Sequence, residues 1–165
     1  MHNTQLSQSM KLGMRRLAAG VCVLSTRTES GELFAMTVSS VTSVSDNPAS
    51  LLVCINKQVS QQGHLSTLGN QFAINILAQD QQEISNICAG RDQLKDRFSI
   101  GSWSQDKQGI PYLEDAQAVF FCRVDMASVY GTHHIVVGLI HDVHVGEKVL
   151  DPLVYVDGRY ARLQS

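Results

Sequence analysis

The sequence lacks several patterns that would assign it to a common functional class. It has no run of Lys and Arg, and its formal net charge is -2, which argues against nucleic-acid binding. No apolar stretch reaches the length of a membrane span, and the first residues, MHNTQLSQSM, lack the hydrophobic region of a signal peptide. We therefore expect a cytoplasmic protein with no nucleic-acid or membrane partner.

Common catalytic and nucleotide-binding motifs are absent as well. Without Gly-x-Gly-x-x-Gly or a Gly-Lys-Ser/Thr box, a bound nucleotide is not held in a Rossmann or P-loop manner. There is no Gly-x-Ser-x-Gly elbow of a serine hydrolase. His141 and His144 fall in a strand-like run, where residues three apart point to opposite faces, so we predict no metal site.

The cysteines form no Cys-x-x-Cys pair, and buried free thiols are the simplest interpretation of them. They are Cys22, Cys54, Cys88 and Cys122.

The composition, with 44% hydrophobic and 17% charged residues, is that of one globular domain, which we assign to residues 1–165. Apolar spacing predicts an amphipathic helix through Leu6, Met10, Met14 and Leu17 that ends near Gly20. Few strand–helix–strand alternations occur, which favours a mainly β fold, a β-barrel with helical additions. The expected strands are 21–27, 33–45, 50–56, 71–77, 116–128, 133–145 and 151–156, with short helices at 60–69 and 80–88.

Small hydroxyl side chains are concentrated in the segment MTVSSVTSVS, residues 36–45. In a strand, Thr37 and Ser39 share one face while Val38 and Ser40 share the other, and neither face is apolar enough for a simple core strand. The segment is either a solvated edge strand or the lining of a polar ligand. A second candidate is the long polar loop 89–109, which carries Arg97 and the single tryptophan.

Taken in order, these segments resemble the flavin reductase-like family, the small NAD(P)H:flavin oxidoreductases that feed reduced flavin to a partner monooxygenase. The chain is most similar to reductase components of aromatic hydroxylases such as 4-hydroxyphenylacetate 3-monooxygenase. One departure is Thr132, since many family members have Gly-Asp-His where this chain has Gly131-Thr132-His133. The matching pieces are Gly20-Val21, MTVSS (36–40), SVS (43–45), Pro48, LVCIN (52–56), Ser60, FAINIL (72–77), Ala89-Gly90, Arg97-Phe98, Trp103, Gly131-Thr132-His133, PLVY (152–155) and GRY (158–160).

The resemblance implies a split β-barrel of the FMN-binding type that forms a homodimer, binds FMN or FAD, and uses NADH or NADPH. Within it, His133 is the catalytic candidate beside the nicotinamide, and Ser60 and Arg97 are expected to bind phosphate. The other residues that the resemblance assigns to cofactor binding are Thr37, Val38, Ser39, Ser40, Ile55, Asn56, Asn75, Ala89, Gly90, Phe98 and Tyr160.

Two other interpretations stay open at this point. The chain is alternatively a non-catalytic split-barrel protein that holds flavin or haem, or a non-catalytic subunit of a monooxygenase complex. NAD(P)H oxidation that depends on added flavin distinguishes the enzyme from both.

Overall fold

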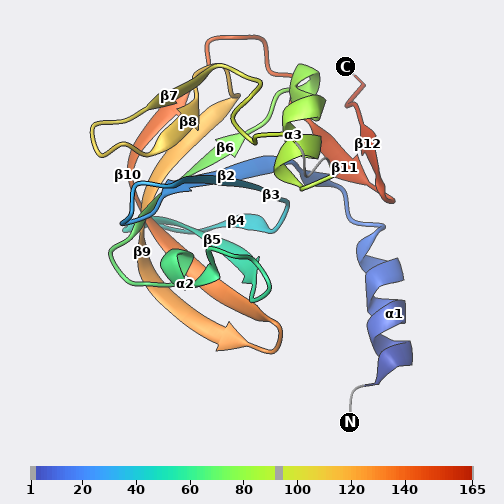
Figure 1. The fold of residues 1–165 in the computed structure, drawn as a ribbon. Helices are drawn as coiled ribbons and strands as arrows, with labels where there is room; N and C mark the ends of the chain where they lie inside the picture. The colour runs from blue at the N-terminus through green and yellow to red at the C-terminus, as the bar shows by residue number, and fades with distance from the viewer. Residues whose placement is uncertain (1–2, 92–94, 165) are drawn as a thin grey trace.

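A computed structural model describes residues 3–91 and 95–164. Seven strands form one antiparallel sheet in the order β3-β2-β6-β9-β10-β5-β4 (Figure 1). This confirms the mainly β fold that the sequence predicts. The strands are β2 Cys22–Arg27, β3 Leu33–Val38, β4 Val41–Asp46, β5 Ala49–Asn56, β6 Gln71–Ile76, β9 Ala118–Tyr130 and β10 His133–Val145.

The two edge strands of this sheet, β3 and β4, are consecutive in the chain and are joined only by Ser39 and Ser40. Three Cα–Cα steps of about 3.8 Å each can span no more than about 11 Å, so the two edges must meet at this end. The sheet therefore curls into a barrel. No ladder of hydrogen bonds pairs β3 with β4 within residues 3–91 and 95–164, so the barrel is split between them. The single strand expected at 33–45 is in fact these two strands.

Alternating side chains of the strands build two separate cores. On β2, Val23 packs in a cluster outside the barrel and Leu24 in the cluster that fills the barrel. On β6, Ala73 packs in the outer cluster and Phe72 packs inside the barrel, because successive side chains of a strand point to opposite faces. Close packing inside the barrel explains Gly138 on β10, because a Cβ there would lie 2.6 Å from Cζ of Phe72.

The outer core is covered by shorter elements. Helix α3 supplies Ile84 and Cys88 to this core, and Figure 1 shows it beside the hairpin of β11 and β12. These elements are the 3₁₀ turn η1 Gln79–Gln81 and α3 Gln82–Cys88, the sheet of β1 Ala19–Gly20, β11 Val154–Val156 and β12 Arg159–Ala161, and the hairpin of β7 Trp103–Gln105 and β8 Pro111–Leu113.

Helix α2, Gln62–Leu65, is shorter than the 60–69 helix that we expected. Ser66 and Thr67 donate hydroxyl hydrogen bonds back to carbonyls of the same turn, which competes with helix continuation. The helix nevertheless connects distant strands. His64 Nε2 lies 3.2 Å from the hydroxyl of Thr26 on β2, and Gln62 accepts a hydrogen bond from Nε2 of His134 on β10.

Helix α1, Thr4–Met14, begins at Asn3, whose side chain accepts a hydrogen bond from the backbone N–H of Leu6. The sequence predicted this helix but placed its end near Gly20, whereas the helix ends at Met14. It buries none of its residues, and Figure 1 shows it projecting from the barrel. Its apolar side chains are more than half exposed, for example Leu6 at 65% and Met14 at 55%. None of the helices in the described parts of the chain is long and apolar enough to cross a bilayer.

The structure changes one argument made from the histidines. The register of β10 against β9 shifts between Ile140 and Asp142, and His141 and His144 line the same surface hollow instead of opposite faces. The bulge breaks the simple alternation on which the expectation rested. His144 lies 3.4 Å from Asp142, and no group of three or more potential ligands is placed to hold a metal among the residues described.

All four cysteines are free thiols, as expected, but they differ in exposure. Cys54 on β5 is partly exposed, whereas the other three are buried. Burial raises the pKa of Cys22, Cys88 and Cys122 to about 12.

Candidate functional site

The split in the barrel brings the hydroxyl-rich segment to the surface. The Thr37 hydroxyl donates to the carbonyl of Ser85 on α3 at 2.6 Å, and the Ser40 hydroxyl is bonded to the backbone of Cys54 on β5. Val38 packs in the barrel core, while Ser39 is exposed. The hydroxyls of Thr37 and Ser40 therefore fix the two edges of the split, and Ser39 lies open to a ligand.

A small hollow of about 190 Å³ opens beside this segment, under the end of α3, and we call it the α3 hollow. Five of its lining residues were expected at a flavin site, namely Thr37, Val38, Ser39, Ala89 and Tyr160. The phenol of Tyr160 donates to Oδ1 of Asn86 at 2.8 Å and lies 2.8 Å from the Ser85 hydroxyl. The full lining is Val21, Thr37, Val38, Ser39, Ser85, Ala89, Arg91, Tyr155 and Tyr160.

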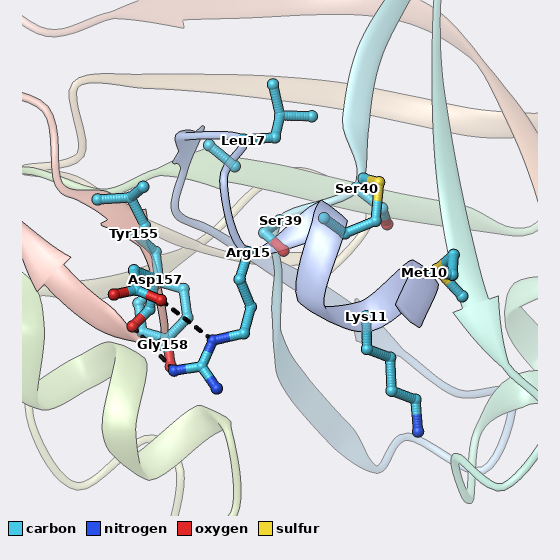
Figure 2. Close-up of a pocket in the computed structure, with 12 residues that line it drawn as sticks. Met10, Lys11, Arg15, Leu17, Ser39, Ser40, Tyr155, Asp157 and Gly158 are labelled. Atoms are coloured by element: carbon cyan, nitrogen blue, oxygen red, sulfur yellow. Dashed lines mark hydrogen bonds and ion pairs between the residues drawn. The ribbon is translucent and has the colours of Figure 1, made fainter. Parts of the chain in front are cut away.

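A second, larger hollow of about 490 Å³ lies between α1 and the barrel, and it shares Ser39 and Tyr155 with the α3 hollow. Figure 2 shows Ser39 and Ser40 facing the helix in this groove. Arg15 extends from the end of α1 to Asp157, with Nε 3.3 Å from the carboxylate and Nη2 donating to the carbonyl (Figure 2). This contact ties the end of the helix to the turn between β11 and β12.

The predicted residues of the loop after α3 gather on the same side. Arg97 donates through Nη1 to the carbonyls of Ala35 and Cys88, and its guanidinium lies 5.1 Å from the ring centroid of Phe34. A Cβ on Gly90 would lie 3.9 Å from Arg97 Nη2, so the guanidinium passes beside Gly90. Phe98 packs edge-on against Trp103 at 4.7 Å and anchors the loop on the outer core.

The catalytic candidate His133 begins β10, directly opposite Asn56 on β5. Its Nδ1 is 2.8 Å from the Thr132 hydroxyl, and the side-chain oxygen Oδ1 of Asn56 accepts the backbone N–H of Gln58. Ile55 is 1% exposed, and its side chain packs in the barrel core. Ser60 is exposed in the turn between β5 and α2.

Asn75 is not brought to this site. It is fully buried, and its amide donates to the Val23 carbonyl and to the Ser25 hydroxyl, both at 2.9 Å, while its oxygen accepts the N–H of Leu113 at 2.8 Å. Both amide hydrogens and the oxygen are therefore used within the protein. The residue joins β2, β6 and β8, which is a structural role.

Sequence reasoning missed Ser85, Tyr155 and Arg91, which line the α3 hollow. Ser85 lies next to Ile84 on the short helix predicted at 80–88, and the structure shows that it is completely buried. A polar side chain at a buried helical position needs a partner, and here the partner is Tyr160. Tyr155 and Arg91 gave no signal in the sequence.

The polar groups around the split suit a phosphate-bearing nucleotide. Exposed hydroxyls, strand edges without a ladder partner and two arginines offer donors to ribityl, ring and phosphate oxygens. The described residues thus fit a flavin or a nicotinamide nucleotide in their donor chemistry.

Comparisons with known proteins agree with this geometry. Residues 14–164 match the flavin reductase like domain family. The chain is 36% identical over 152 residues to the FMN reductase (NADH) RutF of Variovorax paradoxus, covering 92% of this chain and 83% of that one. It is also 36% identical over 157 residues to the reductase component of an FADH(2)-dependent resorcinol hydroxylase of Rhizobium sp., covering 94% and 86%.

Among solved structures, the fold is similar to that of BorF, the flavin reductase component of a bacterial two-component tryptophan halogenase. The TM-score is 0.84 at 31% sequence identity, and the match covers 96% of this chain and 99% of that one. Sequence, fold and comparison agree, and the chain belongs to the flavin reductase like domain family.

Proposed function

We propose that this protein is an NADH-dependent flavin reductase that supplies reduced flavin to a partner monooxygenase. The observation that carries the proposal is the match to the FMN reductase (NADH) of Variovorax paradoxus over 92% of the chain. The similarity to reductase components of a hydroxylase and a halogenase supports the partner oxygenase. Flavin here is FMN or FAD, and reduced flavin reaches the partner by diffusion.

The residues of the split are proposed to hold the flavin. When bound, the flavin supplies the ring that accepts a hydride from the reduced nicotinamide. Ser39, with the backbone of Thr37 to Ser40, binds along the ring and the ribityl chain. Ser60 and the remaining N–H groups of Arg97 bind phosphate, because a guanidinium makes strong charge-assisted hydrogen bonds.

His133 is proposed to orient the nicotinamide. Hydride transfer takes no proton from the protein, so the contribution of this residue is positioning of the two reacting rings. Its location opposite Asn56, with Thr132 holding the imidazole, supports such a role. Tyr160, held by Ser85 and Asn86, is proposed to contact the bound flavin from the α3 hollow.

We also propose that residues 1–165 form one domain that acts in the cytoplasm as a homodimer. The free thiols fit a reducing compartment. The exposed apolar side chains of α1 fit burial against a second copy, because a contiguous apolar surface of this kind marks an interface. Light scattering of the purified protein at several concentrations tests the dimer, and a monomer at all of them would contradict it.

The experiment that tests the function is a steady-state assay of NADH and NADPH oxidation with FMN, FAD or riboflavin added. We expect oxidation to require flavin and to saturate with its concentration, as it does for a dissociable substrate. A protein that keeps its flavin through purification and does not respond to added flavin would favour the non-catalytic flavin-binding alternative.

A further inference from the structure

Arg91 is a cation at the wall of the α3 hollow, and the sequence analysis assigned it no role. Its guanidinium carbon lies 5.7 Å from the centroid of the Tyr160 ring, within the range of a cation–π contact. Tyr160 is itself fixed by Ser85 and Asn86. A rigid aromatic ring therefore holds the arginine beside the exposed Ser39 and Ala89.

The other polar groups of the hollow are bonded to one another. The N–H groups of Ala89, Gly90 and Arg91 donate to carbonyls of α3, and the Thr37 hydroxyl donates to the same Ser85 carbonyl that accepts the N–H of Ala89. The hollow also lies at the C-terminal end of α3, which carries the negative end of the helix dipole. An anion in this hollow consequently depends on the Arg91 guanidinium, helped by the hydroxyl of Ser39.

We infer that Arg91 binds the phosphate of a nucleotide in the α3 hollow, and this inference rests on the proposed reductase function. The volume of about 190 Å³ is below that of ordinary ligand pockets, so the hollow takes part of a nucleotide while the remainder lies outside it. Arg91 and Arg97 flank Gly90 on two sides, with Arg91 toward Tyr160 and Arg97 toward Ala35. Two cations at separate positions suit a reaction between two phosphate-bearing nucleotides.

The test compares Arg91→Gln with a matched control, Arg159→Gln. Arg159 is exposed and precedes Tyr160 on β12, so its side chain points to the other face of that strand. Dissociation constants for FMN and riboflavin are measured by flavin fluorescence, which needs no turnover. KM is measured for NADH and for dihydronicotinamide riboside, which lacks phosphate. Arg91→Lys is included because it keeps the charge.

Loss of a charge-assisted hydrogen bond is expected to weaken the binding of one phosphate-bearing ligand by about tenfold or more. The binding of its phosphate-free counterpart should not change. A selective effect on FMN assigns the phosphate to the flavin, and a selective effect on NADH assigns it to the nicotinamide nucleotide. Partial rescue by Arg91→Lys and no effect of Arg159→Gln support either assignment. Equal effects with and without phosphate would overturn the inference. Absence of NADH oxidation by the wild type would instead reject the proposed function.

Discussion

Asn75 offers a sharp test of which predicted residues act in folding and which in ligand binding. Replacement by Ala removes three buried hydrogen bonds, to Val23, Ser25 and Leu113. Each contributes about 1 kcal/mol net, and a buried N–H or carbonyl left without its partner costs about 1–3 kcal/mol more. We expect Asn75→Ala to lower the free energy of unfolding by about 3–5 kcal/mol, a large part of the roughly 5–15 kcal/mol typical of a folded domain.

The assay is urea unfolding at one fixed protein concentration, followed by Trp103 fluorescence and circular dichroism. With a slope of about 2 kcal/mol per molar urea, the midpoint falls by about 1.5–2.5 M. Asn75→Asp is a matched variant of the same shape, which keeps the acceptor for Leu113 but loses both donors. Asn75→Asp should destabilise the protein at least as much as Asn75→Ala, because it also buries a charge.

The reasoning would be refuted by a loss below about 1 kcal/mol together with a large rise in the flavin dissociation constant. That result would mean that the amide contacts the ligand and not the core. The structural account predicts the reverse, namely unchanged flavin affinity at urea concentrations where the variant remains folded.

Three further predictions follow from single side chains. His133→Ala should still bind flavin but reduce it up to about a hundredfold more slowly in anaerobic stopped-flow, with His141→Ala on the same strand unaffected. A thiol reagent should label Cys54 alone in the native protein, since the other thiols are buried; rapid labelling of a second thiol would contradict the packing. Burial lowers the pKa of His64, against a smaller opposing effect of Glu29. The contribution of neutral His64 to the free energy of unfolding is therefore full above about pH 6.5 and is lost as the pH falls below that value. A His64→Gln variant should lose less stability than the wild type on acidification.

The sequence predicted the longer strands because apolar runs bounded by turn residues are local signals, but it missed the short strands β1, β7, β8 and β12. It could not show that 33–45 is two strands, since the break at Ser39 and Ser40 comes from closure of a barrel whose edge strands are adjacent in the chain. The same limit explains why the expectation that His141 and His144 point to opposite faces failed, since a bulge shifts the register between them and β9. Both effects depend on the partner strands, which no local pattern reports.

The site was predictable only in part for a related reason. Family resemblance placed Thr37, Ser39 and Tyr160, which the fold does gather around one hollow. Alternation along β6 does not distinguish a residue facing a ligand from one facing an outer layer of protein, and Asn75 proved to face β8. Arg91 lies in a loop without periodicity, so its proximity to Tyr160 emerges only from the folded chain.

The most direct test of the central claim is the reduction of free flavin itself. Catalytic amounts of the protein are mixed anaerobically with NADH and an excess of FMN or FAD, and the visible absorbance of the oxidised flavin is followed. The account predicts complete bleaching over many turnovers, with colour returning on admission of air. Bleaching no faster than in the absence of protein, with both flavins and both nicotinamides, would contradict it.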